Sequence, residues 1–144
     1  MKQQFVFLFL PVLFLVACNI SPQPINYGED ACHYCTMTIV DQQHAAQIVT
    51  DKGKAYKFDA IECMLNYHRE NQELNPELYL VNNFMNPGEL INATKATYLI
   101  SKNIPSPMGE YLSGFQTKEA ANETKMKYEG KLYTWQEILD HFSM

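Results

Sequence analysis

The chain has 144 residues, with 11 basic and 16 acidic side chains and a net charge of −5 at pH 7. This acidic balance argues against a nucleic-acid-binding protein, and it provides no basic patch for anionic lipid. The length allows one compact domain, or two small lobes that share a core.

The first 17 residues have the pattern of a lipoprotein signal peptide. Lys2 precedes an apolar run from Phe5 to Ala17, which is thirteen residues long and therefore too short to span a bilayer. The sequence LVAC, residues 15–18, resembles a lipobox, where a signal peptidase cuts before a cysteine that becomes diacylated. We expect a mature chain of 127 residues with a net charge of −6, anchored at Cys18 and exposed to the periplasm. The alternative is a secreted protein in which Cys18 forms a disulfide.

The segment after this cysteine predicts a tether. Residues 18–29 are rich in proline and polar side chains, a composition typical of linkers. The expected organisation is therefore a signal peptide at residues 1–17, a lipidated tether at 18–29 and a globular domain at 30–144.

The globular part shows alternating strand and helix patterns. Residues 44–50 and 54–58 flank the turn sequence DKGK and predict a β-hairpin. Residues 60–70 place apolar side chains three and four apart, which predicts a helix. The other expected elements are strands at 78–83 and 96–101, a turn entering an irregular strand within 103–115, and a polar helix at 117–128 opened by Thr117.

One local pattern occurs twice. GKAYKFDAI at residues 53–61 and GKLYTWQEI at 130–138 share four identities in nine positions. Each predicts a turn, a short strand and a helix start, with Asp59 and Glu62, or Thr134 and Glu137, as capping pairs. A duplication and a common local pattern both explain this similarity. The elements together predict an α+β fold that divides into two small strand-strand-helix-strand lobes.

Sulfur is concentrated just after the tether. ACHYCTMTIV, residues 31–40, contains Cys32, Cys35 and Met37. With Cys63, the chain after the lipidation site has three cysteines, so at least one thiol stays unpaired in an oxidising compartment. This odd number favours a site that keeps thiols reduced, such as a soft-metal site.

The residues alone leave three kinds of site open. A thioredoxin-like redox pair normally opens a helix, whereas this pair is followed by the β-rich stretch TMTIV. Zinc would require Cys63 and a fourth ligand such as His33, His44 or His68. A thioether ligand at Met37 would instead favour Cu(I). Copper, a redox disulfide and zinc therefore remain as alternatives.

A second thioether is placed where packing does not explain it. Met108 lies between proline and glycine in SPMGE, which predicts an exposed turn. It is the best remote candidate for a copper ligand.

Six stretches stand out along the chain: the lipobox at Cys18, DACHYCTM (30–37), AAQI (45–48), FDAIECM (58–64), PMG (107–109) and GKLYTWQE (130–137). In their type and order they resemble the motifs of the NosL family of lipoprotein copper chaperones for nitrous oxide reductase assembly. One position departs from the family pattern, because Thr36 stands where members carry glycine.

The resemblance implies a non-enzymatic, membrane-anchored copper chaperone of denitrification. Such a protein would bind Cu(I) in the periplasm and deliver it, through an ABC-type assembly complex, towards the copper centres of nitrous oxide reductase. The implied fold is related to that of organomercurial lyase. The competing function is that of a periplasmic thiol-disulfide reductant that uses Cys32 and Cys35.

The resemblance also implies a set of metal ligands. The candidates carried over by position are Cys35, Met37 and Met108, with Cys32 close by. Cys63 and Met64 are second candidates, because the expected helix could bury them.

Overall fold

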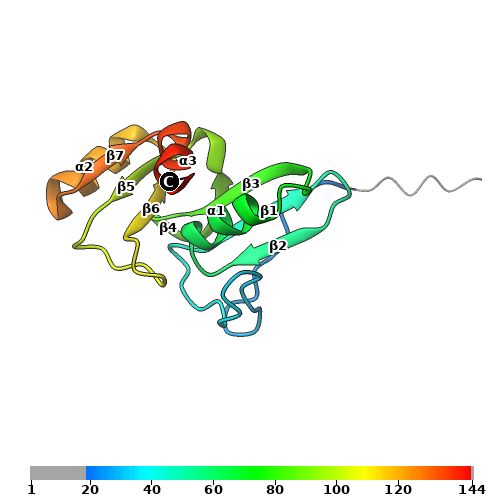
Figure 1. The fold of residues 1–144 in the computed structure, drawn as a ribbon. Coiled ribbons are helices and arrows are strands. Elements are labelled where there is room, and N and C mark those ends of the chain that lie inside the picture. The colour runs from blue at the N-terminus through cyan, green and yellow to red at the C-terminus, as the bar shows by residue number, and fades with distance from the viewer. Residues whose placement is uncertain (1–18, 144) are drawn as a thin grey trace, which may run out of the picture.

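The computed structural model describes residues 19–143 and shows two antiparallel β-sheets with three α-helices (Figure 1). The predicted α+β class is confirmed. The predicted signal peptide and Cys18 lie outside the described residues. The elements are β1 (Ala46–Thr50), β2 (Ala55–Phe58), α1 (Ile61–Glu70), β3 (Pro76–Asn83), β4 (Asn86–Asn92), the 3-10 helix η1 (Ala93–Lys95), β5 (Thr97–Ile100), β6 (Leu112–Phe115), α2 (Lys118–Tyr128), β7 (Lys131–Tyr133) and α3 (Trp135–Ser143).

The two sheets repeat one topology. The first has the strand order β2-β1-β3-β4 and the second the order β6-β5-β7. In each, the first strand pairs with the strand that follows it and with the strand that follows the helix. The predicted strand-strand-helix-strand lobes are thus present, with β4 added to the first. The repeated GK stretches precede α1 and α3, which are not equivalent in this topology, so a common local pattern explains their similarity.

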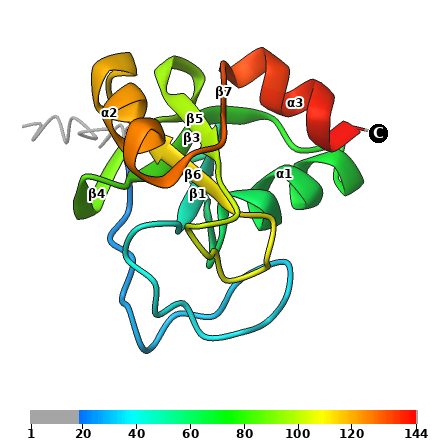
Figure 2. The ribbon, with the colours of Figure 1, turned by 90° about the vertical axis from the view of Figure 1, so that its left-hand side faces the viewer.

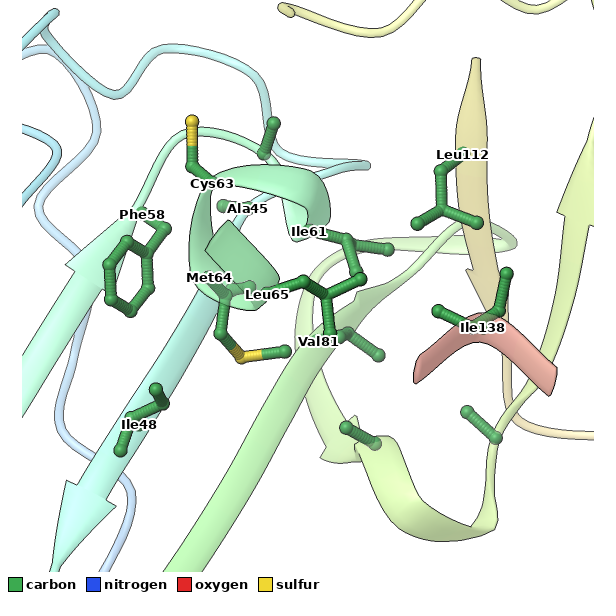
Figure 3. Close-up of a cluster of buried hydrophobic side chains, with 14 of the residues drawn as sticks. Ala45, Ile48, Phe58, Ile61, Cys63, Met64, Leu65, Val81, Leu112 and Ile138 are labelled. Carbon is green, nitrogen blue, oxygen red and sulfur yellow. The ribbon is translucent and has the colours of Figure 1, made fainter. Parts of the chain in front are cut away.

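The lobes share one apolar core. Ile61 of α1, Val81 of β3 and Ile138 of α3 are fully buried in a single cluster between the sheets (Figure 3). The helices α1 and α3 lie side by side (Figure 2), and the guanidinium of Arg69 donates a 2.6 Å hydrogen bond to the carbonyl oxygen of Phe142. Because the core crosses the lobe boundary, the loops of both lobes are held on a common frame.

Two sequence-based expectations about this frame are corrected. Strand β4 was not predicted, because its first residues, Asn86, Pro87 and Gly88, have the composition of a loop. Asp59 does not cap α1, since the N-cap residue is Ala60 and no side chain caps that end. The capping pair of Thr134 and Glu137 and the cap at Thr117 are both confirmed.

Membrane-spanning character is absent from the described helices. Within residues 19–143, none of them combines the length and the apolar composition that crossing a bilayer requires.

A tight loop carries the sulfur motif. The amide of Thr36 donates to the carbonyl oxygen of Cys32, and the amide of Cys32 donates to that of Met37. Thr36 adopts φ 66°, a left-handed conformation that is strained for a β-branched residue. The pairing of Ala31 with Thr38 is an isolated bridge, so residues 36–40 form no regular strand. Accordingly Met37 is exposed while Ile39 is buried, and the two do not share a face.

The left-handed conformation of Thr36 predicts that Thr36→Gly stabilises the domain. We expect the free energy of unfolding to rise by about 1 kcal/mol, because glycine adopts positive φ without steric strain. Thr38→Gly is the matched control in the extended part of the same loop, and we expect it to lower stability. Urea unfolding followed by circular dichroism measures both. A Thr36→Gly protein less stable than the parent would contradict the assignment of strain.

Replacement of Gly130 should have the opposite effect on stability. Its φ is +113°, and a Cβ atom there would lie within hard contact of the Ile100 carbonyl oxygen. We expect Gly130→Ala to lower the free energy of unfolding by roughly 3 kcal/mol. At Gly28, which also has positive φ but open space around it, alanine should cost only about 1 kcal/mol. Equal losses in the two variants, measured by urea unfolding, would show that the close contact has no effect.

Candidate metal centre

Three thiols and one carboxylate converge at the junction of β2 and α1. The ligand atoms of Cys32, Cys35, Asp59 and Cys63 all lie within 4.8 Å of one another. We call these four residues the cysteine cluster. They come from two segments, the 31–38 loop and the turn from β2 into α1.

Backbone pairing holds the two segments together. The amide of His33 donates a 2.9 Å hydrogen bond to the carbonyl oxygen of Lys57, and the amide of Lys57 donates at 3.1 Å to the ring Nδ1 of His33. The ammonium group of Lys57 also contacts the Asp30 carboxylate at 2.6 Å. Asp59 precedes the N-cap residue Ala60, and Cys63 lies in the first turn of α1, so the chain entering the helix places both side chains at this end of it. The edge of β2 therefore brings the loop cysteines to Cys63.

Exposure differs sharply within the cluster. Cys32, Asp59 and Cys63 are 2%, 2% and 1% exposed, whereas Cys35 is partly exposed. All three cysteines are free thiols in the structure. The Cys35 thiol donates a 3.4 Å hydrogen bond to Asp59 Oδ1. Cys35 is thus the member that a metal ion or another protein meets first.

Hydrogen bonding distributes the protons unequally. The thiol of Cys63 donates to Cys32 and lowers the pKa of Cys32 to about 6, with help from nearby backbone amides. The same hydrogen bond, together with burial, raises the pKa of Cys63 well above its usual range. Burial raises the pKa of Cys35 to about 11. Of the three sulfurs, Cys32 is therefore the one whose thiolate form the surroundings favour, whereas a cation would have to replace the protons of Cys35 and Cys63 to bind them as thiolates.

The donor set suits a thiophilic metal. Three sulfurs and one oxygen form a mainly soft site, and thiolate-rich sites select Cu(I) or Zn²⁺. The histidines proposed as a fourth zinc ligand do not join the cluster. His44 is buried between Asp41 and Ser113, with ring nitrogen to oxygen distances of 3.0 and 3.1 Å. His68 contacts the Tyr79 hydroxyl at 3.1 Å. The group that lies with the three thiols is the carboxylate of Asp59.

Sequence reasoning assigned Asp59 to a helix cap and so missed it. A carboxylate directly before a helix is a common capping residue, and nothing local distinguishes that role from metal binding. The four-residue spacing to Cys63 is no signal either, because Asp59 precedes the N-cap residue Ala60 and lies outside the helix.

Cys63 and Met64 have opposite surroundings, although they are adjacent. The Met64 side chain is fully buried in the core beneath α1, and the Cys63 sulfur points away from it (Figure 3). The structure thus brings Cys63 to the loop cysteines and leaves Met64 as a packing residue.

The other two methionine candidates are solvent-accessible. Met37 is 47% exposed and Met108 is 40% exposed. Met108 lies in a turn in which the amide of Gly109 donates to the carbonyl oxygen of Ser106. Both thioethers therefore lie at the surface and not in the core.

A buried carboxylate ties the turn of Met108 to α1. The Ser106 hydroxyl donates a 2.7 Å hydrogen bond to Glu62 Oε1 and accepts one from the amide of Tyr111. Glu62 precedes Cys63 and is 1% exposed, and its burial raises its pKa. The 31–38 and 101–111 loops project from the same side of the molecule (Figures 1 and 2). Met108 is thus carried by a loop that is anchored to the helix turn containing Cys63.

Comparisons with known proteins agree on one family. A family model described as NosL matches residues 24–142. The chain is 28% identical over 127 residues to the copper-binding lipoprotein NosL of Stutzerimonas stutzeri. This match covers 82% of this chain and 67% of that protein. Its fold is similar to the crystal structure of the copper chaperone NosL from Shewanella denitrificans, with a TM-score of 0.70 and 22% identity over 83% of this chain and 96% of that one. Since the family model spans most of its length, this chain belongs to the NosL family.

Proposed function

We propose that this protein is a non-enzymatic, lipid-anchored carrier that binds copper as Cu(I) and delivers it for assembly of the copper centres of nitrous oxide reductase. The observation that carries the proposal is the convergence of three free thiols beside a carboxylate, with one thiol open to solvent. The names of the similar proteins, a copper-binding lipoprotein and a copper chaperone, support copper as the cargo.

Cys32, Cys35 and Cys63 are the proposed thiolate ligands. A monovalent soft ion suits sulfur ligands at low coordination number, and the lowered pKa of Cys32 favours its thiolate form. The Asp59 carboxylate, which accepts a hydrogen bond from the Cys35 thiol, would offer one oxygen donor beside the ion. Zinc is the competing ion for the same four donors.

Delivery requires that the ion can leave. Cys35 is the ligand that is partly exposed. In the proposed release step, the thioethers of Met37 and Met108, which are both exposed, would exchange with it. A partner's methionine or histidine would enter the coordination sphere before a chaperone thiolate departs. The proposed recipient is an ABC-type assembly complex, on the periplasmic side of the membrane. Lipidation at Cys18 would keep the carrier close to this membrane-embedded partner and raise its effective concentration.

The first test is anaerobic Cu(I) titration against a competing chelator. We expect one Cu(I) per chain and a loss of affinity of roughly 100-fold or more in Cys35→Ser and Cys63→Ser, because each removes a thiolate ligand. Met64→Leu is the matched control next to Cys63, and we expect its affinity to stay within about threefold of the parent. Thiol exchange without any metal dependence would instead support a thiol-disulfide reductant. Tighter binding of Zn²⁺ than of Cu(I) under the same competition would identify zinc as the bound ion.

A second test separates binding from transfer. We expect Met108→Leu to weaken Cu(I) binding by only about tenfold, because a thioether adds less than a thiolate. Its larger effect should be on the rate at which Cu(I) passes to a methionine-rich acceptor peptide, measured by stopped-flow spectroscopy. Met126→Leu, which replaces another exposed thioether on α2, is the control. Identical transfer rates for Met108→Leu and the parent protein would remove Met108 from the pathway.

A further inference from the structure

Residues 21–27, within the expected tether, lie against the first sheet. Their exposure alternates, with Ser21, Gln23, Ile25 and Tyr27 partly buried and the residues between them exposed. This period of two is the pattern of an extended segment with one face on the protein. We call residues 19–27 the strap.

Reciprocal hydrogen bonds fix the strap in register. The amide of Gln23 donates a 2.8 Å hydrogen bond to Gln47 Oε1, and Gln47 Nε2 donates at 2.9 Å to the carbonyl oxygen of Gln23. The Tyr27 hydroxyl donates to Asn82 Oδ1 at 3.1 Å. Gln47 and Asn82 are fully buried, although both are polar residues on strands. The strap supplies the backbone partners that Gln47 needs.

The strap covers the face of the sheet that α1 does not cover. Ala46 and Ile48 of β1 belong to the main core cluster, so Gln47 and Val49 point to the opposite face. Val49 is nevertheless fully buried. Release of the strap would expose this apolar surface to water, which favours the docked state.

The start of the strap lies at one end of the β1–β2 hairpin. The carbonyl oxygen of Asn19 is 3.5 Å from the position of a Cβ atom on Gly53, in the turn between these strands. The blue start of the described chain reaches this turn in Figure 1. In the sequence Asn19 directly follows Cys18, the proposed lipidation site.

The cysteine cluster lies at the other end of the same hairpin. Asp59 directly follows β2, six residues after Gly53. An extended chain rises about 3.3 Å per residue, which separates the two ends by about 20 Å. The hairpin therefore forms a fixed spacer between the anchored end and the metal site.

We propose that the strap orients the domain on the phospholipid surface, with the turn of residues 50–54 against the headgroups and the cysteine cluster directed away from the bilayer. The inference rests on lipidation at Cys18, as proposed above. The turn presents Lys52, Lys54 and one acid, Asp51, all exposed, and the exposed Glu73 lines the same surface hollow. Because two acids offset the two lysines, the lipid at Cys18 would hold the turn at the surface, with the ammonium groups beside the phosphates. The site would then face a partner's periplasmic surface and not lie beside the lipid.

The test is lysine footprinting of the lipidated full chain in vesicles of zwitterionic and anionic phospholipid. An amine-reactive ester is applied, and the rate at each lysine is measured by mass spectrometry relative to the protein in detergent. We expect the rates at Lys52 and Lys54 to fall by about fivefold in vesicles. Lys118 and Lys125, exposed on α2, should change by less than about twofold. Equal protection of all four lysines, or of none, would overturn the orientation.

A linker variant tests whether the strap causes the orientation. Insertion of a flexible Gly/Ser segment of about 20 residues before Asn19 leaves the docked strap intact but frees it from the lipid. Protection of Lys52 and Lys54 should then disappear, and its persistence would contradict the role of the strap.

The anchor and the cargo are checked separately on the same sample. Flotation with vesicles shows whether the chain is lipidated, and a chain that does not float would overturn both the anchor and the orientation. Cu(I) titration in detergent reports on the proposed cargo alone, so a failure of orientation leaves that result unchanged.

Discussion

Four acidic groups within 4.8 Å of one another cannot all be ionised without a cation, and this crowding governs the site. The protein relieves it by hydrogen bonding, with Cys63 donating to Cys32 and Cys35 donating to Asp59. A bound Cu(I) would supply one positive charge and displace the proton of each thiol that coordinates it. Metal binding and proton release would therefore be coupled.

The structure around the cluster combines buried cysteines in fixed positions with sulfur-containing side chains that solvent can reach. The shared core and the pairing of His33 with Lys57 hold Cys32 and Cys63 in fixed, buried positions. Cys35 is partly exposed and Met37 and Met108 are exposed, and all three are on loops, where the proposed ligand exchange would need no opening of the core. A carrier needs both properties, since rigid ligands confer affinity and accessible ones allow release.

Much of the fold could be predicted because its elements carry strong local patterns. The β1–β2 hairpin, α1 and the Thr117 cap follow from periodicity and capping residues that act within a few positions. Strand β4 could not be predicted, because Pro87 and Gly88 near its start favour a turn or loop. Pairing with β3 overrides this local preference. The site shows the same division. The spacing of Cys32 and Cys35 is visible in the sequence, but their loop docks on β2 through contacts of Lys57 with His33 and Asp30, which are distant in sequence and follow from no local pattern.

The central claim is that sulfur atoms from two segments bind one Cu(I), and X-ray absorption spectroscopy of the copper-loaded protein tests it most directly. We expect an absorption edge typical of Cu(I) and a first coordination shell dominated by sulfur, which loses one sulfur neighbour in Cys63→Ser. A first shell of nitrogen and oxygen, or a sulfur shell that is unchanged in Cys63→Ser, would contradict it.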